Sequence, residues 1–240
     1  RKQVLLVSDQ EVLSSSLTQY SDYMKSAKKS SSKDGAAMVT RVGKKIAAAT
    51  EQYLRNNGLE SEIKNFAWEF NLVNDPQVNA FCMPGGKIVV YEGLMQLVSS
   101  DDELAVVVGH EVAHAVAKHS NERMSQQLMA QYGAQILGQA LSNKSTAVQK
   151  IGASVYGLGA QYGVMLPFSR KHESEADYMG LVFMAMAGYN PAVAVNFWQK
   201  MSAGKSGSTP EFMSTHPSDA TRINEIKQHL PEIEKYRVKK

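Results

Sequence analysis

The sequence predicts an α+β domain in which helices dominate and a small antiparallel β-sheet lies beside one long helix. Apolar residues recur every three or four positions in several segments, as on the buried face of a helix. Between residues 66 and 91 they instead alternate with polar residues and flank a Pro-Gly-Gly turn, which is typical of antiparallel strands. With 43% hydrophobic and 20% charged residues, the 240-residue chain can fill a core, and its charge density is too low for a disordered protein.

The first 35 residues are predicted to form a helical extension followed by a linker. Residues 11–28 have a helical pattern, and the Ser-Ser-Ser-Lys-Asp-Gly run at 30–35 has the composition of a break between elements. We therefore expect two units, an extension at 1–35 and a main domain at 36–240. The main domain should open with a helix at 36–57, whose apolar residues have helical spacing.

A long helix is expected to begin after Ser100. The Ser100 hydroxyl can accept a hydrogen bond from the amide of Glu103 while the Glu103 carboxylate reaches back to the amide of Ser100, which is the capping box. No proline interrupts the apolar residues that follow, so the helix should continue to about residue 116. The remaining elements are expected as strands within 66–72, 80–82 and 87–91 and as helices at 171–188, 191–203 and 218–229.

Charge and cysteine content exclude several kinds of site. The 26 basic and 23 acidic residues give a net charge of +3 without long basic blocks, so the sequence offers no electrostatic case for a nucleic-acid partner. The single cysteine, Cys82, can form neither an intrachain disulfide nor a Cys-x-x-Cys metal site, and we expect it to be a small buried residue. Any metal must therefore be held by nitrogen and oxygen atoms.

Two uncharged runs, at 124–143 and 151–169, have about the length that crosses a bilayer. Their glutamines, glycines and one proline are unfavourable in hydrocarbon, because polar groups there need partners. We expect an amphipathic hairpin that can lie against a membrane surface or act as a lid, with a membrane-inserted hairpin as the alternative.

The long helix carries the sequence His110-Glu111-Val112-Ala113-His114, which is the HExxH pattern. Four residues advance a helix by about 400°, so the two imidazoles lie about 40° apart on one face and can hold one cation. The carboxylate of Glu111 lies about 60° from His114, where it can reach a metal-held water as a general base. The alternative is a surface helix whose imidazoles pair with nearby acids.

A catalytic zinc ion usually takes a third protein ligand, which must come from elsewhere in the chain. The candidates that carry a suitable side chain are His119, Glu122, His172, Glu173, Glu175, Glu211, His216 and His229. His119 lies about 140° round the helix from His114, so it is expected to point away into solvent.

The segment 169–177 is densest in usable groups. Glu173 and Asp177 are four residues apart and share a helix face, whereas Glu175 is turned about 200° from Glu173 and is expected to be a surface or packing charge. From the spacing alone Glu173, His172 and Glu175 remain rival ligands.

Three motifs in order make the chain resemble a known family. They are His110-Glu111-x-x-His114, Ser169-Arg170-x-x-Glu173-x-Glu175-Ala176-Asp177-x-x-Gly180, and His216-Pro217-Ser218-x-x-x-Arg222. Over about residues 60–230 the chain is similar to the zinc metallopeptidases of the HtpX, Oma and CAAX-prenyl-protease type, peptidase family M48. The resemblance implies a zincin-like fold, polypeptide substrates, and one Zn²⁺ per chain held by His110, His114 and Glu173.

The resemblance also implies roles for residues around the metal. Asp177 would orient a ligand imidazole, the alternative being an exposed helix carboxylate. His216 and Arg222 would lie beside the metal, where either could stabilise the oxyanion, or His216 could occupy the fourth zinc position; the alternative is a capping histidine and a surface arginine. Asn79 and Ala80 would lie along the substrate backbone, unless their strand merely closes the sheet.

A zinc endopeptidase, with Glu111 as general base on a zinc-bound water, is the function expected from these residues and the resemblance. Its substrates would be misfolded or envelope proteins, as in protein quality control. The alternatives are a chaperone or assembly factor with a latent or structural zinc ion, and an exopeptidase. The resemblance favours a periplasmic or envelope-associated lipoprotein anchored through a segment before Arg1, with a mitochondrial location as the alternative.

Overall fold

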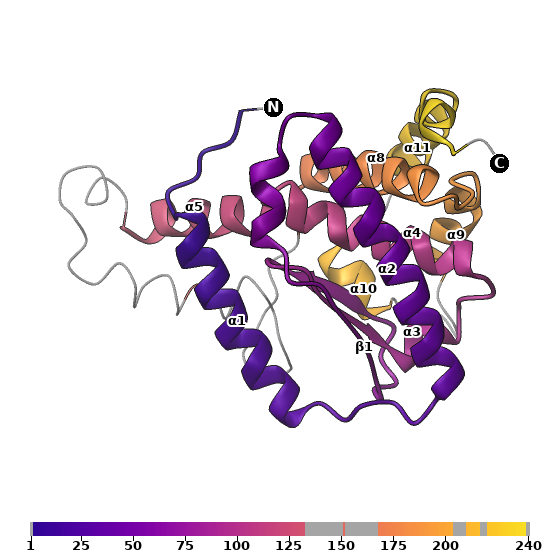
Figure 1. Cartoon of the computed structure of the whole chain (residues 1–240), viewed down its shortest axis with the longest axis horizontal. Helices are drawn as coiled ribbons and strands as arrows, with labels where there is room; N and C mark the ends of the chain where they lie inside the picture. The colour runs from indigo at the N-terminus through magenta and orange to yellow at the C-terminus, as the bar shows by residue number, and fades with distance from the viewer. Residues whose placement is uncertain (1, 133–150, 152–167, 204–209, 217–219, 239–240) are drawn as a thin grey trace.

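A computed structural model describes residues 2–132, 151, 168–203, 210–216 and 220–238 (Figure 1). The elements are α1 (Asp9–Ser26), α2 (Lys33–Asn56), the 3₁₀ helix η1 (Glu60–Asn65), β1 (Glu69–Val73), β2 (Ala80–Met83), β3 (Lys87–Tyr91), α3 (Glu92–Met95), α4 (Asp101–Val116), α5 (His119–Tyr132), α8 (Arg170–Met186), α9 (Val193–Ala203), α10 (Glu211–Thr215), α11 (Ala220–Ile233) and the 3₁₀ helix η2 (Glu234–Tyr236). The helix-dominated α+β class expected from the sequence is confirmed.

The sheet is mixed rather than wholly antiparallel. Its strand order is β1-β3-β2, with β2 antiparallel to β3 and β1 parallel to β3. The β2–β3 turn is the expected one, and Gly85 and Gly86 there have φ of 95° and 82°, which glycine adopts without steric cost. The chain between β1 and β2 crosses to the far edge of β3. Alternation of apolar residues cannot reveal that crossing, because it is the same in parallel and antiparallel strands.

Both faces of the sheet are covered. Ile88 and Val90 of β3 point into the main core, which is shared with α2, α4 and α8. Val89 and Tyr91 point the other way, into a second cluster that includes Val12 and Tyr20 of α1 and Met124 of α5. Because successive side chains of a strand point to opposite faces, β3 is buried on both sides and lies at the centre of the molecule.

Helix α1 is tied to the sheet by polar contacts as well. The Tyr20 hydroxyl donates a hydrogen bond to Glu69 Oε2 at 2.8 Å, and Ser16 Oγ donates to the carbonyl of Pro84 at 2.7 Å. Beyond α1, the amide of Ser30 donates to the carbonyl of Leu72 at 2.9 Å. The chain that leads from α1 to α2 therefore runs along the outer edge of β1.

Helix α4 begins where the sequence predicts, with one change in its cap. The Ser100 side chain accepts from the amide of Glu103 as expected. The Glu103 carboxylate, however, accepts from the amide of Ser99 at 2.8 Å, and both of its oxygens also contact Lys200 Nζ. The ion pair with α9 thus adds a tertiary contact to the cap.

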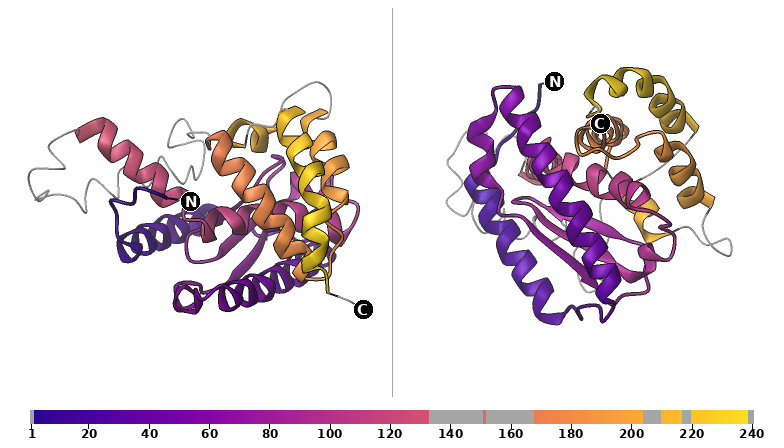
Figure 2. Two further views of the ribbon diagram at one scale, coloured as in Figure 1. Left: turned by 90° about the horizontal axis from the view of Figure 1, so that it is seen from above. Right: turned by 45° about the vertical axis from the view of Figure 1, so that its right-hand side comes forward.

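Helices α4 and α8 cross with their backbones in contact. A Cβ atom on Gly109 would lie 2.8 Å from the carbonyl oxygen of Gly180, and one on Gly180 would lie 2.8 Å from the amide nitrogen of His110. The space left by the missing side chain of Gly109 is therefore filled by Gly180. Figures 1 and 2 show α8, α9 and α11 gathered on one side of α4, with the sheet on another side.

Most of the uncharged hairpin expected between residues 124 and 169 lies outside the described residues. Its first part continues α5, whose Met124 and Leu128 are buried against the second cluster. Within the part of the chain that the structure describes, no helix combines the length and the apolar character needed to cross a bilayer.

Substituting Gly180 tests the close crossing. We expect Gly180→Ala to lower the free energy of unfolding by about 1–3 kcal/mol, because the added methyl must push apart two backbones that cannot yield locally. Equilibrium urea unfolding would measure it. Gly35→Ala in α2 is the matched control, since its Cβ would meet the ends of the Leu72 and Ser32 side chains. A Gly180→Ala protein as stable as the wild type, or stabilised by helix propensity, would contradict the crossing.

Candidate metal centre

Four buried side chains from three elements converge at one point. His110 and His114 come from α4, Glu173 from α8, and His216 follows the last residue of α10. No more than 4% of any of them is exposed, and their nearest ligand atoms all lie within 4.8 Å of one another. The structure therefore brings together the two HExxH histidines with Glu173, and it adds His216 to them.

The distances between these atoms suit a tetrahedral metal ion. Bonds of 2.0–2.1 Å to a central ion place tetrahedral ligands roughly 3.3 Å apart. His110 Nε2 lies 3.0 Å from His114 Nε2, 3.2 Å from His216 Nδ1 and 3.4 Å from Glu173 Oε2, and Glu173 Oε1 lies 3.3 Å from His114 Nε2 and 3.0 Å from His216 Nδ1. Three ring nitrogens and a carboxylate, with no sulfur, form a set that binds Zn²⁺.

Short elements fix the position of His216. The amide of Phe212 in α10 donates to the carbonyl of Val78 just before β2, and the amide of Phe168 donates to the carbonyl of Thr215. The His216 ring stacks on Phe212, with 4.4 Å between ring centroids. The neighbouring residues Pro217 and Ser218, part of the third motif, lie outside the described residues.

His110 is oriented from behind by a charged pair. Its Nδ1 lies 2.9 Å from Asp177 Oδ1, and since a carboxylate only accepts, the His110 ring donates from Nδ1 and turns its Nε2 toward the ligand set. Asp177 in turn accepts from Arg222 Nη2 at 2.8 Å and from Arg222 Nε. Both Asp177 and Arg222 are buried next to the His110 ring.

The Arg222 guanidinium also reaches the ligand set itself. Its Nη1 lies 2.8 Å from Glu173 Oε2 and 3.4 Å from the carbonyl of His216. Its planar group lies over the Trp198 ring at 4.6 Å. Arg222 thus neutralises two buried carboxylates, which would otherwise be costly to desolvate.

The surroundings of each ligand suit its role. Burial would raise the pKa of the Glu173 carboxyl, but His216 and Arg222 outweigh it and hold that pKa well below its usual range, so Glu173 is ionised. Burial lowers the pKa of His114 well below its usual range and keeps its ring neutral. Burial also lowers the pKa of His110, but Glu173 and Asp177 reverse this and raise it to about 9. Carboxylates that favour a proton on His110 equally favour a metal cation.

Glu111 lies beside the ligand set without belonging to it. It is 4% exposed, and its Oε1 lies 3.4 Å from His216 Nε2. The backbone amide of Cys82 on β2 donates to its carboxylate. Burial raises the pKa of the Glu111 carboxyl, and the electrostatic attraction of the His216 and His110 imidazoles only partly offsets that rise. A carboxylate with a raised pKa, next to a cation site, is suited to taking and returning a proton.

Contrary to the expectation from the sequence, His119 does not point into solvent. It is fully buried, and its Nδ1 lies 2.8 Å from Nδ1 of His114 while its Nε2 lies 3.1 Å from Glu175 Oε2. The expectation assumed one uninterrupted helix, whereas α4 ends at Val116 and Lys118 has φ of 57°. Glu175 is accordingly a partner of His119 as well as a partly exposed charge. A further histidine only five residues after the HExxH pattern is a signal that could have raised this possibility.

The remaining candidate ligands lie away from the donor set. His172 Nε2 lies 3.2 Å from Glu122 Oε2, so these two residues pair with each other. Glu211 is in the first turn of α10, where it contacts Ser214. The ring of His229 packs against Tyr178, with 5.0 Å between centroids.

Asn79 directly precedes β2 and Ala80 is its first residue; β2 is an edge strand of the sheet beside α4. Both are buried, and the Asn79 side chain accepts from the amide of Ala80 at 2.9 Å. On the inner side, the Asn79 carbonyl accepts from the amide of Tyr91 in β3. Cys82 of the same strand is buried, as the sequence indicates.

Most of the chain matches a known protein family. The sequence of residues 40–230 matches the family described as Peptidase family M48. This range includes α4, α8 and α10, and thus every side chain of the donor set.

Relatives from eukaryotes and bacteria match the same region. The chain is 36% identical over 205 residues to the mitochondrial metalloendopeptidase OMA1 of Schizosaccharomyces pombe, covering 82% of this chain and 53% of that protein. It is 40% identical over 168 residues to the protein of that name from Arabidopsis thaliana, covering 70% and 33%. It is 33% identical over 174 residues to the beta-barrel assembly-enhancing protease of Yersinia pestis, covering 68% and 36%. The chain therefore spans between about a third and a half of these relatives.

Metal removal tests the donor set. We expect purified protein to hold one Zn²⁺ per chain, and a chelator to lower its thermal unfolding midpoint, because an empty site leaves buried lone pairs and charges without a cation. Zinc should restore the midpoint. Glu173→Ala should lose most of this response, while His229→Ala should keep it. If the chelator does not change the thermal unfolding midpoint of the zinc-loaded wild type, the proposed metal site is wrong.

Proposed function

The chain belongs to peptidase family M48, and from this premise we propose that it is a zinc-dependent endopeptidase that hydrolyses peptide bonds of polypeptide substrates. The observation that carries the proposal is the position of Glu111, a buried carboxylate next to three ring nitrogens and the Glu173 carboxylate but outside that set. A structural site needs only the ligands. A carboxylate placed beside them, with a raised pKa, is what a hydrolytic site adds.

The chain's own residues perform the proton transfers. Bound zinc supplies a Lewis acid that polarises the scissile carbonyl and makes water more acidic. Glu111 takes a proton from the attacking water and then passes it to the departing amine. Asp177 holds His110 in the tautomer whose Nε2 faces the cation, and Arg222 keeps the Asp177 and Glu173 carboxylates charged and in place. Arg222 thus has most of its donors directed at the site's own carboxylates.

We propose that His216 occupies the fourth ligand position of the metal site. Its Nδ1 is within 3.2 Å of His110 Nε2 and within 3.0 Å of Glu173 Oε1, and its Nε2 faces Glu111. A ring in that place excludes a substrate carbonyl. We propose that this is a resting state and that His216 withdraws before a substrate binds. His216 directly follows the short helix α10, and such a movement would strain the backbone hydrogen bonds that join α10 to Val78 and Phe168.

We place the substrate along strand β2. An edge strand can pair with an extended peptide, and Ala80 is the first residue of the edge strand that packs beside α4, with Asn79 directly before it. To pair with the peptide, the Ala80 amide would exchange its bond to the Asn79 side chain for one to the substrate. The hydrogen bond from Cys82 to Glu111 ties the same strand to the proton-transferring residue.

We propose a location in a membrane-bounded compartment, with misfolded or envelope proteins as substrates. Supporting this, relatives are named mitochondrial metalloendopeptidases or a beta-barrel assembly-enhancing protease. The relatives at 36% and 40% identity are mitochondrial, whereas the Yersinia pestis protease is 33% identical, so the mitochondrial alternative has more support than a lipid-anchored periplasmic location. A chaperone or assembly factor with structural zinc is not favoured, because the matched family consists of peptidases.

Glu111→Gln tests the general base. We expect it to retain one zinc per chain and to slow cleavage of an unfolded protein substrate by roughly 10²- to 10⁴-fold, since an amide cannot accept the proton. Zinc content and peptide release are measured on the same sample. Cleavage at the wild-type rate by the zinc-loaded variant would show that Glu111 is not the base.

His216→Ala tests the resting state. If the ring blocks the fourth position, its removal should increase cleavage severalfold while three ligands still hold zinc. The matched control is His229→Ala, which removes a histidine far from the site. A variant that binds zinc and folds like wild type but cleaves no faster would contradict the blocking role of His216.

A further inference from the structure

We propose that His119 is a positioning residue of the metal centre, which fixes the tautomer and orientation of His114, and that Glu175 orients His119 in turn. The inference rests on the proposed zinc site. His119 Nδ1 lies 2.8 Å from His114 Nδ1, and His119 Nε2 lies 3.1 Å from Glu175 Oε2. The mechanism above assigns a role to neither His119 nor Glu175.

The order of the protons along the hydrogen-bonded series His114, His119 and Glu175 follows from the two ends of the series. To bind a cation, His114 must turn an unprotonated Nε2 toward the donor set, so its one ring proton lies on Nδ1. That proton is donated to His119 Nδ1, which leaves the His119 proton on Nε2. At the outer end the Glu175 carboxylate can only accept, and His119 Nε2 donates to it. Both ends therefore require the same order, and both rings are neutral.

A break in the helix makes the contact possible. In an uninterrupted helix His119 would lie about 140° from His114, too far round to touch it. Lys118 instead has φ of 57°, in the left-handed region that residues other than glycine seldom adopt, and α5 begins at the next residue. The turn brings His119 back onto the outer nitrogen of His114. Backbone strain of this kind persists where surrounding structure enforces it.

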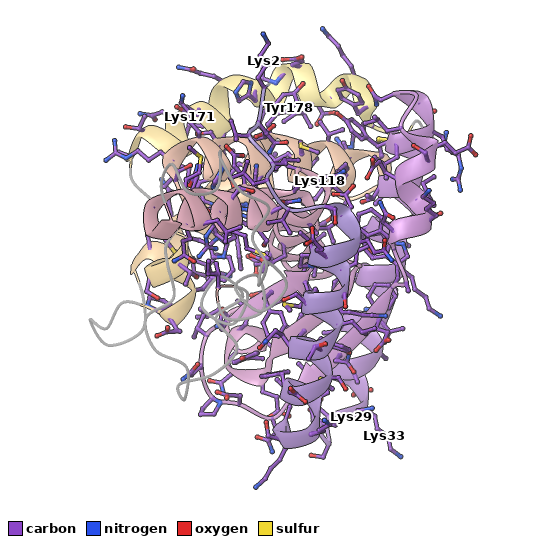
Figure 3. The ribbon with its side chains drawn as sticks, turned by 90° about the vertical axis from the view of Figure 1, so that its left-hand side faces the viewer. Lys2, Lys29, Lys33, Lys118, Lys171 and Tyr178 are labelled. Atoms are coloured by element: carbon purple, nitrogen blue, oxygen red, sulfur yellow. The ribbon has the colours of Figure 1, made fainter. Side chains whose placement is uncertain are left out.

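Contacts from the N-terminal part of the chain hold that turn. Lys118 Nζ lies 2.7 Å from Asp9 Oδ2 in the first turn of α1 and 3.0 Å from Glu62 Oε2 in η1. Figure 3 shows Lys118 in the upper part of the molecule, well away from Lys29 and Lys33 at its lower end. The His119 ring is further fixed by stacking on His172, with 4.4 Å between centroids and 25° between planes.

The two histidines of the HExxH pattern thus have different outer partners. His110 donates to Asp177, a carboxylate that Arg222 neutralises, whereas His114 donates to a neutral imidazole whose carboxylate lies one ring further out. The imidazole supplies an acceptor without placing another negative charge beside Glu173. Outer partners of metal-binding histidines typically contribute 10- to 100-fold to metal affinity.

Zinc affinity of the full chain, measured by competition with a chromophoric chelator, tests this role without reference to cleavage. His119→Phe keeps a ring on His172 but offers no acceptor, so its zinc Kd should rise about 10- to 100-fold. His119→Gln retains an acceptor oxygen and should recover part of the loss. Glu175→Ala should raise the Kd by a smaller factor, without lowering the thermal midpoint of the metal-free protein. His229→Phe is the control and should bind like wild type.

The outcomes distinguish a failure of the positioning role of His119 from a failure of the proposed zinc-dependent function. A wild-type Kd for folded His119→Phe would overturn the role of His119. If His119→Phe does not fold, an unchanged Kd in Glu175→Ala overturns the proposal instead. A raised Kd in His119→Phe with an unchanged one in Glu175→Ala would remove Glu175 from it. A wild-type protein that binds no zinc would contradict the proposed function itself.

Discussion

The metal centre depends on one steric constraint, the contact between the backbones of α4 and α8 at Gly109 and Gly180. A side chain at either position would meet a backbone atom at 2.8 Å. Glu173 lies about two turns before Gly180 on α8, and Asp177 lies less than one turn before it. Because the helices approach so closely, both side chains reach the His110 side of α4. The apolar residues of α4 are buried against the sheet and its neighbouring helices, so α4 itself cannot shift to accommodate a wider separation.

The close crossing has an electrostatic consequence, because it buries two carboxylates side by side. Arg222 contacts both, and its guanidinium is itself enclosed by Trp198. One arginine and a divalent cation together balance Glu173, Asp177 and the nearby Glu111. Buried ions are tolerated when they are paired and hydrogen-bonded, and removing any one leaves the others uncompensated. The site is therefore a single charge-balanced unit, in which metal binding completes the balance.

Much of the site could be predicted from the sequence, since helical spacing places His110 with His114 and Glu173 with Asp177 on common faces. The choice of Glu173 over His172 and Glu175 needed the family resemblance, because spacing does not say which face of α8 meets α4. The parallel pairing of β1 was not predictable from alternation, and the Glu103 cap shifted because Lys200 of a distant helix binds its carboxylate. His119 was misplaced for a similar reason: the turn at Lys118 is stabilised by Asp9 and Glu62, contacts that only the folded chain creates.

We propose that three imidazoles and one carboxylate surround a single zinc ion in the resting protein, and X-ray absorption at the zinc edge would measure these neighbours. We expect four nitrogen or oxygen neighbours at about 2.0–2.1 Å, with the outer-shell signature of three imidazole rings. A spectrum with a sulfur neighbour, or with only one imidazole, would contradict it.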